Sequence, residues 1–458
     1  MTNENLSQMQ VGIGKYKGLI AVATFFIFIA ITFSSTKNMA IIYFAFGVVT
    51  IFSGLIYLQA YLFESGGKKV FMREEDYPSL AVLIPNRNSS TTIERALQSI
   101  VNLKYPKPFE ILVLDDYSTD NCLELIQKFA DRYSSIKIIR NEKNIGKAAS
   151  LNDAIKRTNA DIVACIDSDT YPPEDALIKM VPCFCHKKNI GAVTAFITTS
   201  EPKTLLQKVQ ELEYFNAFGF TSKVMSNING LIVTPGPMTL FKRKALVKVG
   251  GFDEKNLTED LEIGLRLQKN RYVIEYCSDA VIPTEVPETF KKLYHQRERW
   301  YRGTIFNLNK YREMMLDKKY ENVGLFSYPT CLLYVGFTIL TFSILLCYLV
   351  KDVVLRAEVF LSGLSASSGN LFNYLSYTGY TDIASMPLFF NSVFLVFFVL
   401  LVCFWIFCLY NSMKMAKIRI RPSHVPAIGF ILLIYPMMIS LFYLISFVKE
   451  LCGSGMKW

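Results

Sequence analysis

The sequence lacks the glycine-rich signatures of two large nucleotide-binding classes. Neither a Gly-x-Gly-x-x-Gly segment nor a Walker A segment occurs between about residues 79 and 283. A dinucleotide-binding or P-loop protein would therefore be without the backbone cradle that holds its phosphates. Internal repeats and low-complexity linkers are absent as well.

The ten cysteines contain no Cys-x-x-Cys pair, so the commonest signature of a structural zinc site or a redox centre is missing. Cys183-Phe184-Cys185-His186 could bind a metal. A partly buried structural pair of cysteines in a reducing cytoplasm is the favoured alternative.

Charged residues are missing from five long stretches. Hydrophobic residues make up 51% of the chain and the mean hydropathy is +0.27, too apolar for an ordinary soluble enzyme and too charged for a pure transmembrane bundle. Each stretch is long enough for a helix to cross a bilayer, which takes roughly 17 to 25 residues. They run over residues 18–34, 39–63, 323–350, 386–410 and 425–448. The first could instead be a signal-peptide core, but a second span follows almost at once and no cleavage site is clear.

Basic residues predict the orientation of these spans. They cluster after the second span, before the third and between the fourth and fifth, as Lys68, Lys69, Arg73, Lys310, Arg312, Lys318, Lys319, Lys414, Lys417, Arg419 and Arg421. The positive-inside rule places all of them in the cytoplasm, so we expect a multi-pass protein of the plasma membrane with its large domain inside. The formal net charge of +10 suits an anionic membrane surface and phosphate-bearing ligands. Nucleic acid is not an expected partner, because it would require basic and aromatic residues gathered on a soluble module.

Between the second and third spans, short apolar runs alternate with helical patterns, which predicts an α/β domain with a largely parallel sheet. Strands are expected over residues 80–85, 109–114, 136–140 and 161–166, with helices after Thr91 and over 120–133 and 147–158. Thr91 and Glu94 have the spacing of a capping box. Polar residues follow successive strands, where open α/β sheets bind their ligands.

Two acidic pairs follow predicted strands. Asp167 and Asp169 offer oxygen ligands of the kind that Mg²⁺ or Mn²⁺ prefers, although a D-x-D tripeptide arises by chance about once in a chain this long. Asp115 and Asp116 precede a turn that a helix cap at Thr119 or Asp120 would explain. The doubled carboxylate needs a nearby donor or cation, and a nucleobase or ribose is a plausible partner.

Thr258-Glu259-Asp260 begins a predicted helix. Capping by Thr258 and the helix dipole account for these residue types on their own. The competing interpretation is a general base that removes a proton from an incoming hydroxyl.

Gln296-Arg297-Glu298-Arg299-Trp300 lies in a basic, amphipathic stretch over residues 288–315. An interfacial helix with a membrane-belt tryptophan would explain this composition without catalysis. Gln296, Arg299 and Trp300 nevertheless bring hydrogen-bonding, phosphate-pairing and sugar-stacking groups into about one helical turn, which favours a functional role.

In their order along the chain, these segments resemble the inverting glycosyltransferase family 2. The resemblance covers residues 79–303 and is strongest to the membrane-embedded processive branch of cellulose, chitin, hyaluronan and poly-N-acetylglucosamine synthases. It also includes an opening-strand motif at 83–88, an N-x-G-K segment at 144–147 and the loop Thr234-Pro235-Gly236-Pro237 at the position of the family's acceptor-side loop. Ser89 replaces the usual acidic residue, and the loop matches no single synthase, so the sugar stays open.

The resemblance implies a role for each matched residue. Asp260, with Glu259, would be the catalytic base, and Asp169 and Asp167 would hold Mg²⁺ or Mn²⁺. The nucleotide-sugar site would comprise Pro85, Asp115, Asp116, Lys147, Asp167, Gln296, Arg299 and Trp300. The acceptor would meet Trp300, Gly236, Pro237 and Thr258. The expected activity is that of a metal-dependent inverting hexosyltransferase acting on a nucleoside diphosphate sugar, with a UDP-sugar favoured.

We therefore expect a cytoplasmic GT-A-like domain inserted between two N-terminal and about three C-terminal transmembrane helices. The predicted divisions are 1–65 (hairpin), 66–285 (glycosyltransferase domain), 286–322 (amphipathic interface helices) and 323–458 (C-terminal spans). The partners would be the donor, a polysaccharide or lipid-linked acceptor and membrane lipids, with a small accessory subunit or a homo-oligomer as a further candidate. Transfer of a single sugar to a lipid carrier and a catalytically inactive membrane component are the alternatives. An ion-coupled transporter is not favoured, because the spans contain no ionisable residue of the kind that relays ions.

Overall fold

The computed structural model describes residues 53–62, 72–366 and 392–453 of the chain. The chain divides into two compact units. One comprises Met1–Leu55, Tyr334–Ile406 and Pro436–Trp458, and the other comprises Ile56–Leu333 and Phe407–Tyr435. The second unit contains all the strands and the predicted site residues.

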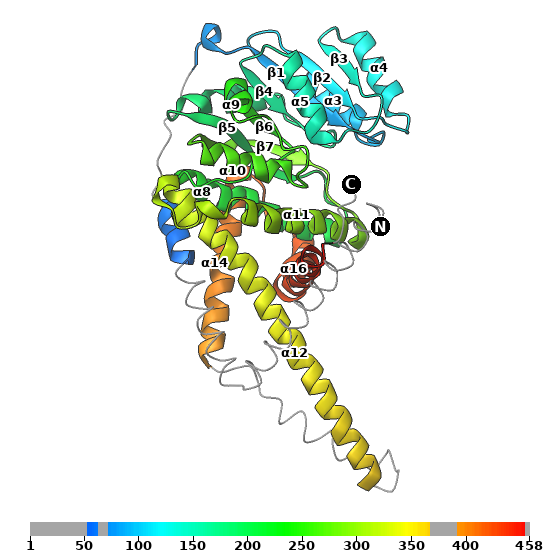
Figure 1. Cartoon of the computed structure of the whole chain (residues 1–458), viewed down its shortest axis with the longest axis vertical. Helices are drawn as coiled ribbons and strands as arrows, with labels where there is room; N and C mark the ends of the chain where they lie inside the picture. Colours follow the sequence, from blue (N-terminus) through cyan, green and yellow to red (C-terminus); the bar gives the residue numbers. More distant parts are fainter. Residues whose placement is uncertain (1–52, 63–71, 367–391, 454–458) are drawn as a thin grey trace, which may run out of the picture. The chain divides into compact units, whose positions relative to one another are not determined.

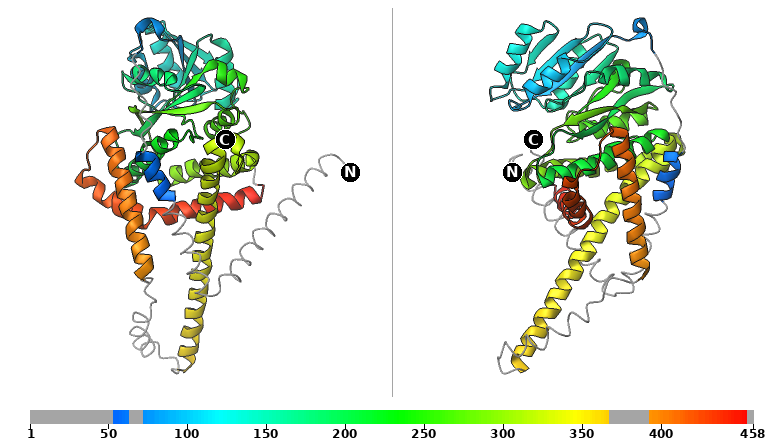
Figure 2. Two further views of the ribbon diagram at one scale, coloured as in Figure 1. Left: turned by 90° about the vertical axis from the view of Figure 1, so that its left-hand side faces the viewer. Right: turned by 180° about the vertical axis from the view of Figure 1, so that it is seen from behind.

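Seven strands form one sheet in the second unit (Figure 1). They are β1 (Leu80–Asn86), β2 (Glu110–Asp115), β3 (Ile136–Arg140), β4 (Ile162–Cys165), β5 (Ile190–Thr199), β6 (Thr239–Lys242) and β7 (Val273–Thr284). Their spatial order is β3-β2-β1-β4-β6-β5-β7. Only β6 runs antiparallel to its neighbours among the described strands, which confirms the predicted α/β class with a largely parallel sheet. Figure 2 shows the sheet from two further directions, with β1–β3 at one edge and β5–β7 at the other.

Helices follow most strands. Those of the sheet domain are α3 (Ile93–Val101), α4 (Cys122–Arg132), α5 (Lys147–Arg157), α6 (Ala176–Met180), α7 (Leu205–Tyr214), α8 (Ser222–Asn227), α9 (Arg243–Lys248), α10 (Glu259–Lys269) and α11 (Phe290–Lys310). The later helices are α12 (Tyr328–Ala366), α14 (Ser392–Ala416), α15 (Val425–Leu433) and α16 (Tyr435–Leu451), and residues 53–62 are helical as well. Short 3₁₀ or π segments lie at Glu74–Asp76, Val181–Cys185, Phe215–Thr221, Arg312–Met314, Lys318–Tyr320, Val323–Ser327 and Pro422–His424.

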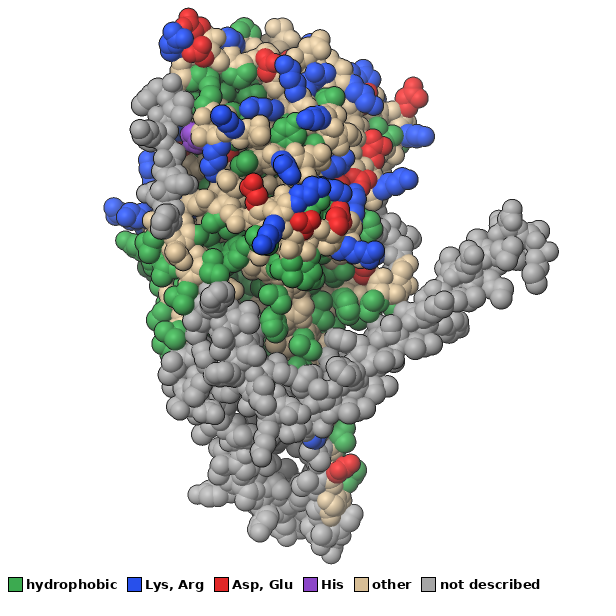
Figure 3. Space-filling view, turned by 60° about the vertical axis from the view of Figure 1, so that its left-hand side comes forward, with side chains coloured by type: hydrophobic (Ala, Val, Ile, Leu, Met, Phe, Trp, Pro, Cys, Tyr) green, Lys and Arg blue, Asp and Glu red, His purple; other side chains and the backbone are tan. Residues whose placement is uncertain are grey.

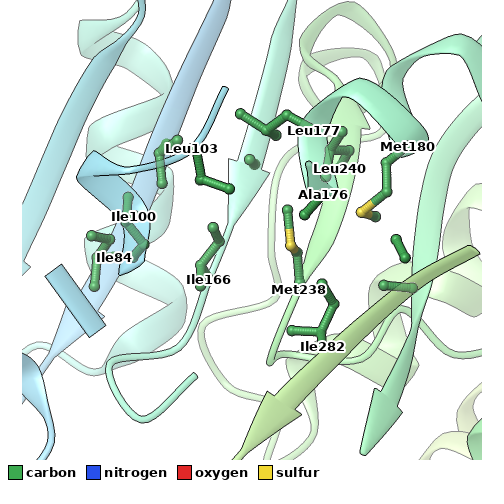
Figure 4. Packing of buried hydrophobic residues seen from close by; sticks show 14 of the residues in the cluster. Ile84, Ile100, Leu103, Ile166, Ala176, Leu177, Met180, Met238, Leu240 and Ile282 are labelled. Carbon is green, nitrogen blue, oxygen red and sulfur yellow. The ribbon is translucent and has the colours of Figure 1, made fainter. Parts of the chain in front are cut away.

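The core lies on the face of the sheet that α3, α4 and α6 cover. Apolar side chains of β1, β4, β6 and β7, and of residues next to β4 and β6, meet those of α3 and α6 there. They include Ile84, Ile100, Ile166, Leu177, Met238, Leu240 and Ile282 (Figure 4). All seven of these side chains are fully buried. This packing fixes the ends of the central strands, where the polar residues lie. On the face shown in Figure 3, charged side chains, mostly Lys and Arg, are scattered over the described sheet domain among hydrophobic and other residues.

The predicted elements of the first half of the domain agree with the structure to within about two residues, and 136–140 agrees at both ends. The capping box is wrong. Helix α3 starts at Ile93 with Thr92 at its N-cap and no side-chain cap, because the Thr92 hydroxyl donates to the Ser89 carbonyl instead (3.3 Å). The predicted cap of α4 at Thr119 or Asp120 is also wrong, because the N-cap is Asn121, which has no side-chain cap. Asp120 Oδ1 still accepts from Cys122 N at the start of the helix (3.2 Å).

Two described helices are long and apolar enough to cross a membrane. They are Val323–Lys351 and Val399–Ala416, with mean hydropathies of 2.2 and 1.7, and Pro422–Leu433 with Tyr435–Leu451 forms a third candidate bent by 49°. This agrees with about three C-terminal spans by length and composition. The first predicted N-terminal span lies outside the described residues, and so does the second except for residues 53–62, which are helical. The predicted four-part division of the chain stays a prediction.

Candidate active site

The polar residues predicted from the sequence gather at the carboxyl ends of β1, β2 and β4. Pro85, half-buried near the end of β1, pairs with Leu114 of β2, and the next pair is Asn86 with Asp115. The chain leaves β4 just before Asp167. Because these strands are parallel neighbours, residues far apart in sequence meet at one edge of the sheet.

Asp115 lies in a small polar enclosure. Asn86 Nδ2 donates to its Oδ1 (3.2 Å), and Arg140 Nε at the end of β3 lies 3.6 Å from its Oδ2. The carboxylate is fully buried, yet its Oδ2 and the Asn86 Oδ1 accept no hydrogen bond within the described residues. Buried acceptors without donors are uncommon in folded proteins, so these two oxygens are suited to a ligand that donates hydrogen bonds.

Asp116 is fully occupied by the protein itself. Its Oδ1 accepts from Asn141 Nδ2 (3.0 Å) and from the backbone N–H of Ile145 (2.8 Å), and its Oδ2 accepts from Gly146 N (2.9 Å). The side chain therefore shapes the loop that begins α5, where Gly146 has a φ of +90°. This loop presents Lys147, the first residue of α5.

Lys147 joins two of the predicted acidic motifs. Its Nζ lies 2.6 Å from Asp167 Oδ1 and 3.0 Å from Glu259 Oε1. Burial alone would lower the pKa of Lys147, but the two carboxylates raise it, so the ammonium is firmly charged. Burial would likewise raise the pKa of Glu259, and Lys147 followed by Arg299 lowers it. One cation thus holds together residues from α5, the end of β4 and the start of α10.

Gly236 lies against this ion pair. A Cβ at this position would stand 2.6 Å from Asp167 Oδ2 and 3.0 Å from Lys147 Nζ, so only glycine fits without displacing the pair. The loop is tied to α10, because the hydroxyl of Thr234 donates to the Asp260 carbonyl (2.8 Å). Pro237 follows half-buried. The structure therefore places the predicted acceptor-side loop beside Lys147 and Asp260.

Asp260 is partly buried at the start of α10, and its Oδ1 accepts from Leu261 N (2.8 Å). Burial first, and the charge of Glu259 second, raise its pKa to about 6. A carboxylate with such a pKa is a stronger base than an exposed one and is still deprotonated at neutral pH.

The residues present fit a divalent cation at Asp167 and Asp169. Their carboxylates are oxygen donors, and burial followed by the charge of Asp167 raises the pKa of Asp169 to about 6. A bound cation would offset both effects. Over residues 53–62, 72–366 and 392–453, no three His, Cys, Asp or Glu side chains converge to form a complete cage. The remaining ligands would come from water and a diphosphate, which is usual for Mg²⁺.

Helix α11 carries the motif at Gln296–Trp300. Arg299 Nη1 donates to the Leu257 carbonyl (3.1 Å), just ahead of α10. Trp300 is half-buried and packs against the core cluster, and Gln296 has a buried Oε1 that accepts no hydrogen bond within the described residues. The Thr258 hydroxyl faces α11, because it accepts from Asn307 Nδ2 (3.0 Å). A side-chain cap on α10 is absent for this reason.

Sequence reasoning missed several residues of this site. Arg297 is fully buried, lies with its guanidinium carbon 4.1 Å from the centre of the Trp300 ring and donates to Glu213 Oε2 (2.5 Å). Asn86, Arg140 and Asn141 surround the Asp115–Asp116 pair. Asn86 and Arg140 end strands and Asn141 follows β3 directly, so their position at the carboxyl ends of parallel strands is the signal that could have found them.

Residues 78–303 match the family model described as Glycosyltransferase like family 2. Poly-beta-1,6-N-acetyl-D-glucosamine synthase of Staphylococcus aureus strain COL is 34% identical over 236 residues, which are 52% of this chain and 57% of that protein. The protein of the same name from Staphylococcus epidermidis is 34% identical over 224 residues, 49% of this chain and 54% of that protein. The match thus spans little more than half the length of these relatives.

A solved structure of a mannosyltransferase from Pyrobaculum calidifontis, in complex with GDP-Man and Mn²⁺, is similar with a TM-score of 0.55. It is 17% identical and covers 81% of this chain and 96% of its own. At this identity the likeness shows the fold, a mixed α/β glycosyltransferase fold of the GT-A type. The match to the family and to the named synthases confirms the resemblance seen in the motifs, and this chain carries a glycosyltransferase domain of family 2.

Proposed function

We propose that this protein is an inverting glycosyltransferase that elongates a polysaccharide at the cytoplasmic face of a membrane, using a nucleoside diphosphate sugar. UDP-N-acetylglucosamine is the first donor to test, because the relatives found by sequence are N-acetylglucosamine polymer synthases. The observation that carries the proposal is the convergence of Lys147, Asp167 and Glu259, with Gly236 packed against them. Three separated motifs meet there around one half-buried cation.

In this mechanism the donor base lies against Asp115 Oδ2 and Asn86 Oδ1, neither of which accepts a hydrogen bond from the described residues. When the donor binds, its diphosphate replaces one of the carboxylate contacts of Lys147. The ammonium then contacts phosphate oxygens as well as a carboxylate. Arg299, held near the start of α10 by the Leu257 carbonyl, adds a second positive charge. Cations placed where negative charge develops stabilise the departing diphosphate.

Asp260 takes the proton of the acceptor hydroxyl as its oxygen attacks the anomeric carbon. The bond from that carbon to the diphosphate oxygen breaks, its electron pair leaves with the nucleoside diphosphate, and the configuration at the carbon inverts. Trp300 offers an indole face to the terminal acceptor sugar. No protein nucleophile is needed.

A Mg²⁺ or Mn²⁺ ion held by Asp169, with Asp167, would neutralise charge on the leaving diphosphate. The protein's own part in that site is to place two carboxylates beside Lys147. Thr284 and Thr170 hydroxyls bond to Asp169 Oδ1, each at 3.4 Å, and orient it.

The apolar helices would anchor the domain and pass the growing chain outward. The three C-terminal candidates support a multi-pass arrangement. Membrane lipids, and an accessory subunit or a second copy, would then be partners of that region.

The test presents purified protein in lipid with Mg²⁺ or Mn²⁺ and a panel of labelled nucleotide sugars. A ladder or long polymer from one donor is the expected result. A single lipid-soluble product would replace elongation with transfer to a lipid carrier. If no donor is consumed in any combination, the protein is not a glycosyltransferase of either kind.

A further inference from the structure

We propose that a buried amide pair, Asn256 and Asn307, positions the catalytic base by fixing the start of α10 against α11, an inference that rests on the function proposed above. Asn256 precedes α10, and Asn307 lies in the last third of α11. The two helices lie side by side in the sheet domain (Figure 1). One carries Asp260 and the other carries Gln296, Arg299 and Trp300.

The two amides bond to each other in both directions. Asn256 Nδ2 donates to Asn307 Oδ1 (2.8 Å), and Asn307 Nδ2 donates to Asn256 Oδ1 (3.1 Å). Asn256 is 1% exposed and Asn307 is fully buried. Asn256 Oδ1 also accepts from Thr258 N (3.1 Å), so the pair reaches to within two residues of the base.

Further contacts tie the same short segment to α11. Asn307 Nδ2 donates to Thr258 Oγ1 (3.0 Å), and Arg299 Nη1 donates to the Leu257 carbonyl (3.1 Å). Gly303 lies one turn before Asn307, and a Cβ there would overlap the Thr258 side chain. Residues 256–258 are therefore held by three successive turns of α11.

A second anchor lies just beyond the base. Glu262 is fully buried, and its Oε1 accepts from Lys310 Nζ (2.7 Å) and from the Tyr311 hydroxyl (2.5 Å) at the end of α11. Asp260 lies between the two anchors. The first turn of α10 is thus fixed to one helix on both sides of the catalytic carboxylate.

Buried polar contacts of this kind specify one arrangement. Two helices joined only by apolar side chains can shift along each other at little cost, whereas any shift here would leave buried amide groups without partners. The helix fixed in this way contains the residues that meet diphosphate and acceptor. Asn256 and Asn307 therefore act as positioning residues. They keep Asp260 within reach of the hydroxyl of an acceptor sugar that stacks on Trp300.

The test compares Asn256→Ala, Asn307→Ala and the double variant with wild type. Each is assayed in lipid with Mg²⁺ and UDP-N-acetylglucosamine, or with another donor if the panel of nucleotide sugars identifies one. Asn309→Ala is the matched control, because it removes the same amide from an exposed site two residues away on α11. We measure kcat, KM for the donor, UDP binding and the melting temperature. Each buried single variant should lose about 10- to 100-fold in kcat, since a displacement of about 1 Å can cost that much, with KM and UDP binding within about twofold of wild type. The kcat of the double variant should fall no further than that of the more impaired single variant, because each single substitution already breaks the same Asn256–Asn307 pair.

Three outcomes would overturn the inference. In the first, Asn307→Ala has the same kcat as Asn309→Ala. In the second, the kcat of Asn307→Ala falls only in proportion to a loss of folded, UDP-binding protein. In the third, the fold-loss in kcat of the double variant equals the product of the two single fold-losses. If wild type and Asn309→Ala both transfer no sugar, the proposed function fails instead, so the two failures are distinguishable.

Discussion

At the scale of single residues, the site is organised around Lys147. Its ammonium contacts Asp167 and Glu259, and Gly236 closes the space beside it. Two carboxylates this close would repel each other without a cation between them. In the proposed function the same ammonium would also contact the donor diphosphate, so one side chain would hold the site together and bind the ligand.

Gly236→Ala tests this close packing. A Cβ 2.6 Å from Asp167 Oδ2 must displace the carboxylate, and overpacking of this kind costs about 1–3 kcal/mol. We expect KM for the donor to rise by about five- to hundredfold. Gly429→Ala is the control, because its Cβ meets no described atom within 4 Å. Equal KM values in the two variants would mean that the loop does not border the donor.

The raised pKa of Asp260 predicts how activity depends on pH. A base must be deprotonated, so transfer should be full at neutral pH, half-maximal near pH 6 and fall about tenfold for each further pH unit. The ratio kcat/KM, measured from pH 5 to pH 8, checks this, because it reports the pKa values of the free enzyme. A rate that stays flat down to pH 5 would show that no group with this pKa limits the reaction.

At the scale of elements, α11 connects the active site to the rest of its unit. Arg297 is fully buried in this helix and donates to Glu213 of α7, which also accepts from the Tyr435 hydroxyl (2.7 Å). The same guanidinium lies over the ring of Trp300. Arg297, which directly follows the motif's Gln296, is thus part of the framework that holds Trp300.

Arg297→Leu should therefore destabilise the protein. Removing one partner of a buried ion pair costs about 3–5 kcal/mol, and we expect the low end because the Glu213 side chain is 27% exposed. Thermal unfolding in detergent measures this, with the exposed Lys291→Leu on the same helix as control. Equal melting temperatures for Arg297→Leu and Lys291→Leu would show that Arg297 does not stabilise this part of the protein.

Much of this arrangement could be predicted from the sequence, because the signals that predict it lie in short segments of the chain. Apolar runs bounded by turns predicted β1 to β4 closely, and the motifs predicted which residues gather at the strand ends. The sequence could not show that both carboxylate oxygens of Asp116 accept hydrogen bonds from the loop before α5, because this depends on the directions of the backbone N–H groups. It also predicted no partner for Asn307, since an asparagine late in an amphipathic helix is expected at the surface.

At the scale of the whole molecule, a family 2 domain is followed in the described part of the chain by helices apolar enough to cross a membrane. The described C-terminal helices offer up to three spans, and the basic flanks predict a cytoplasmic domain. Under the proposed function, the donor would come from the cytoplasm and the product would pass across the bilayer.

Cysteine labelling tests this orientation. Cys185 is exposed on the sheet domain and Cys452 is half-buried near the end of the chain. A membrane-impermeant maleimide should label Cys452 on intact cells but Cys185 only after the membrane is opened, with Cys185→Ser and Cys452→Ser identifying the two signals. Labelling of Cys185 on intact cells would reverse the predicted orientation.

The central claim is that Asp260, held at the start of α10, is the base of an inverting sugar transfer. The most direct measurement compares sugar transfer and UDP binding by wild type and Asp260→Asn in lipid. We expect transfer to fall by about 10²- to 10⁴-fold while UDP binds almost unchanged, because in the proposed function the base acts on the acceptor and the nucleotide would bind at Asp115 and Lys147. Transfer by Asp260→Asn at the wild-type rate would contradict the account.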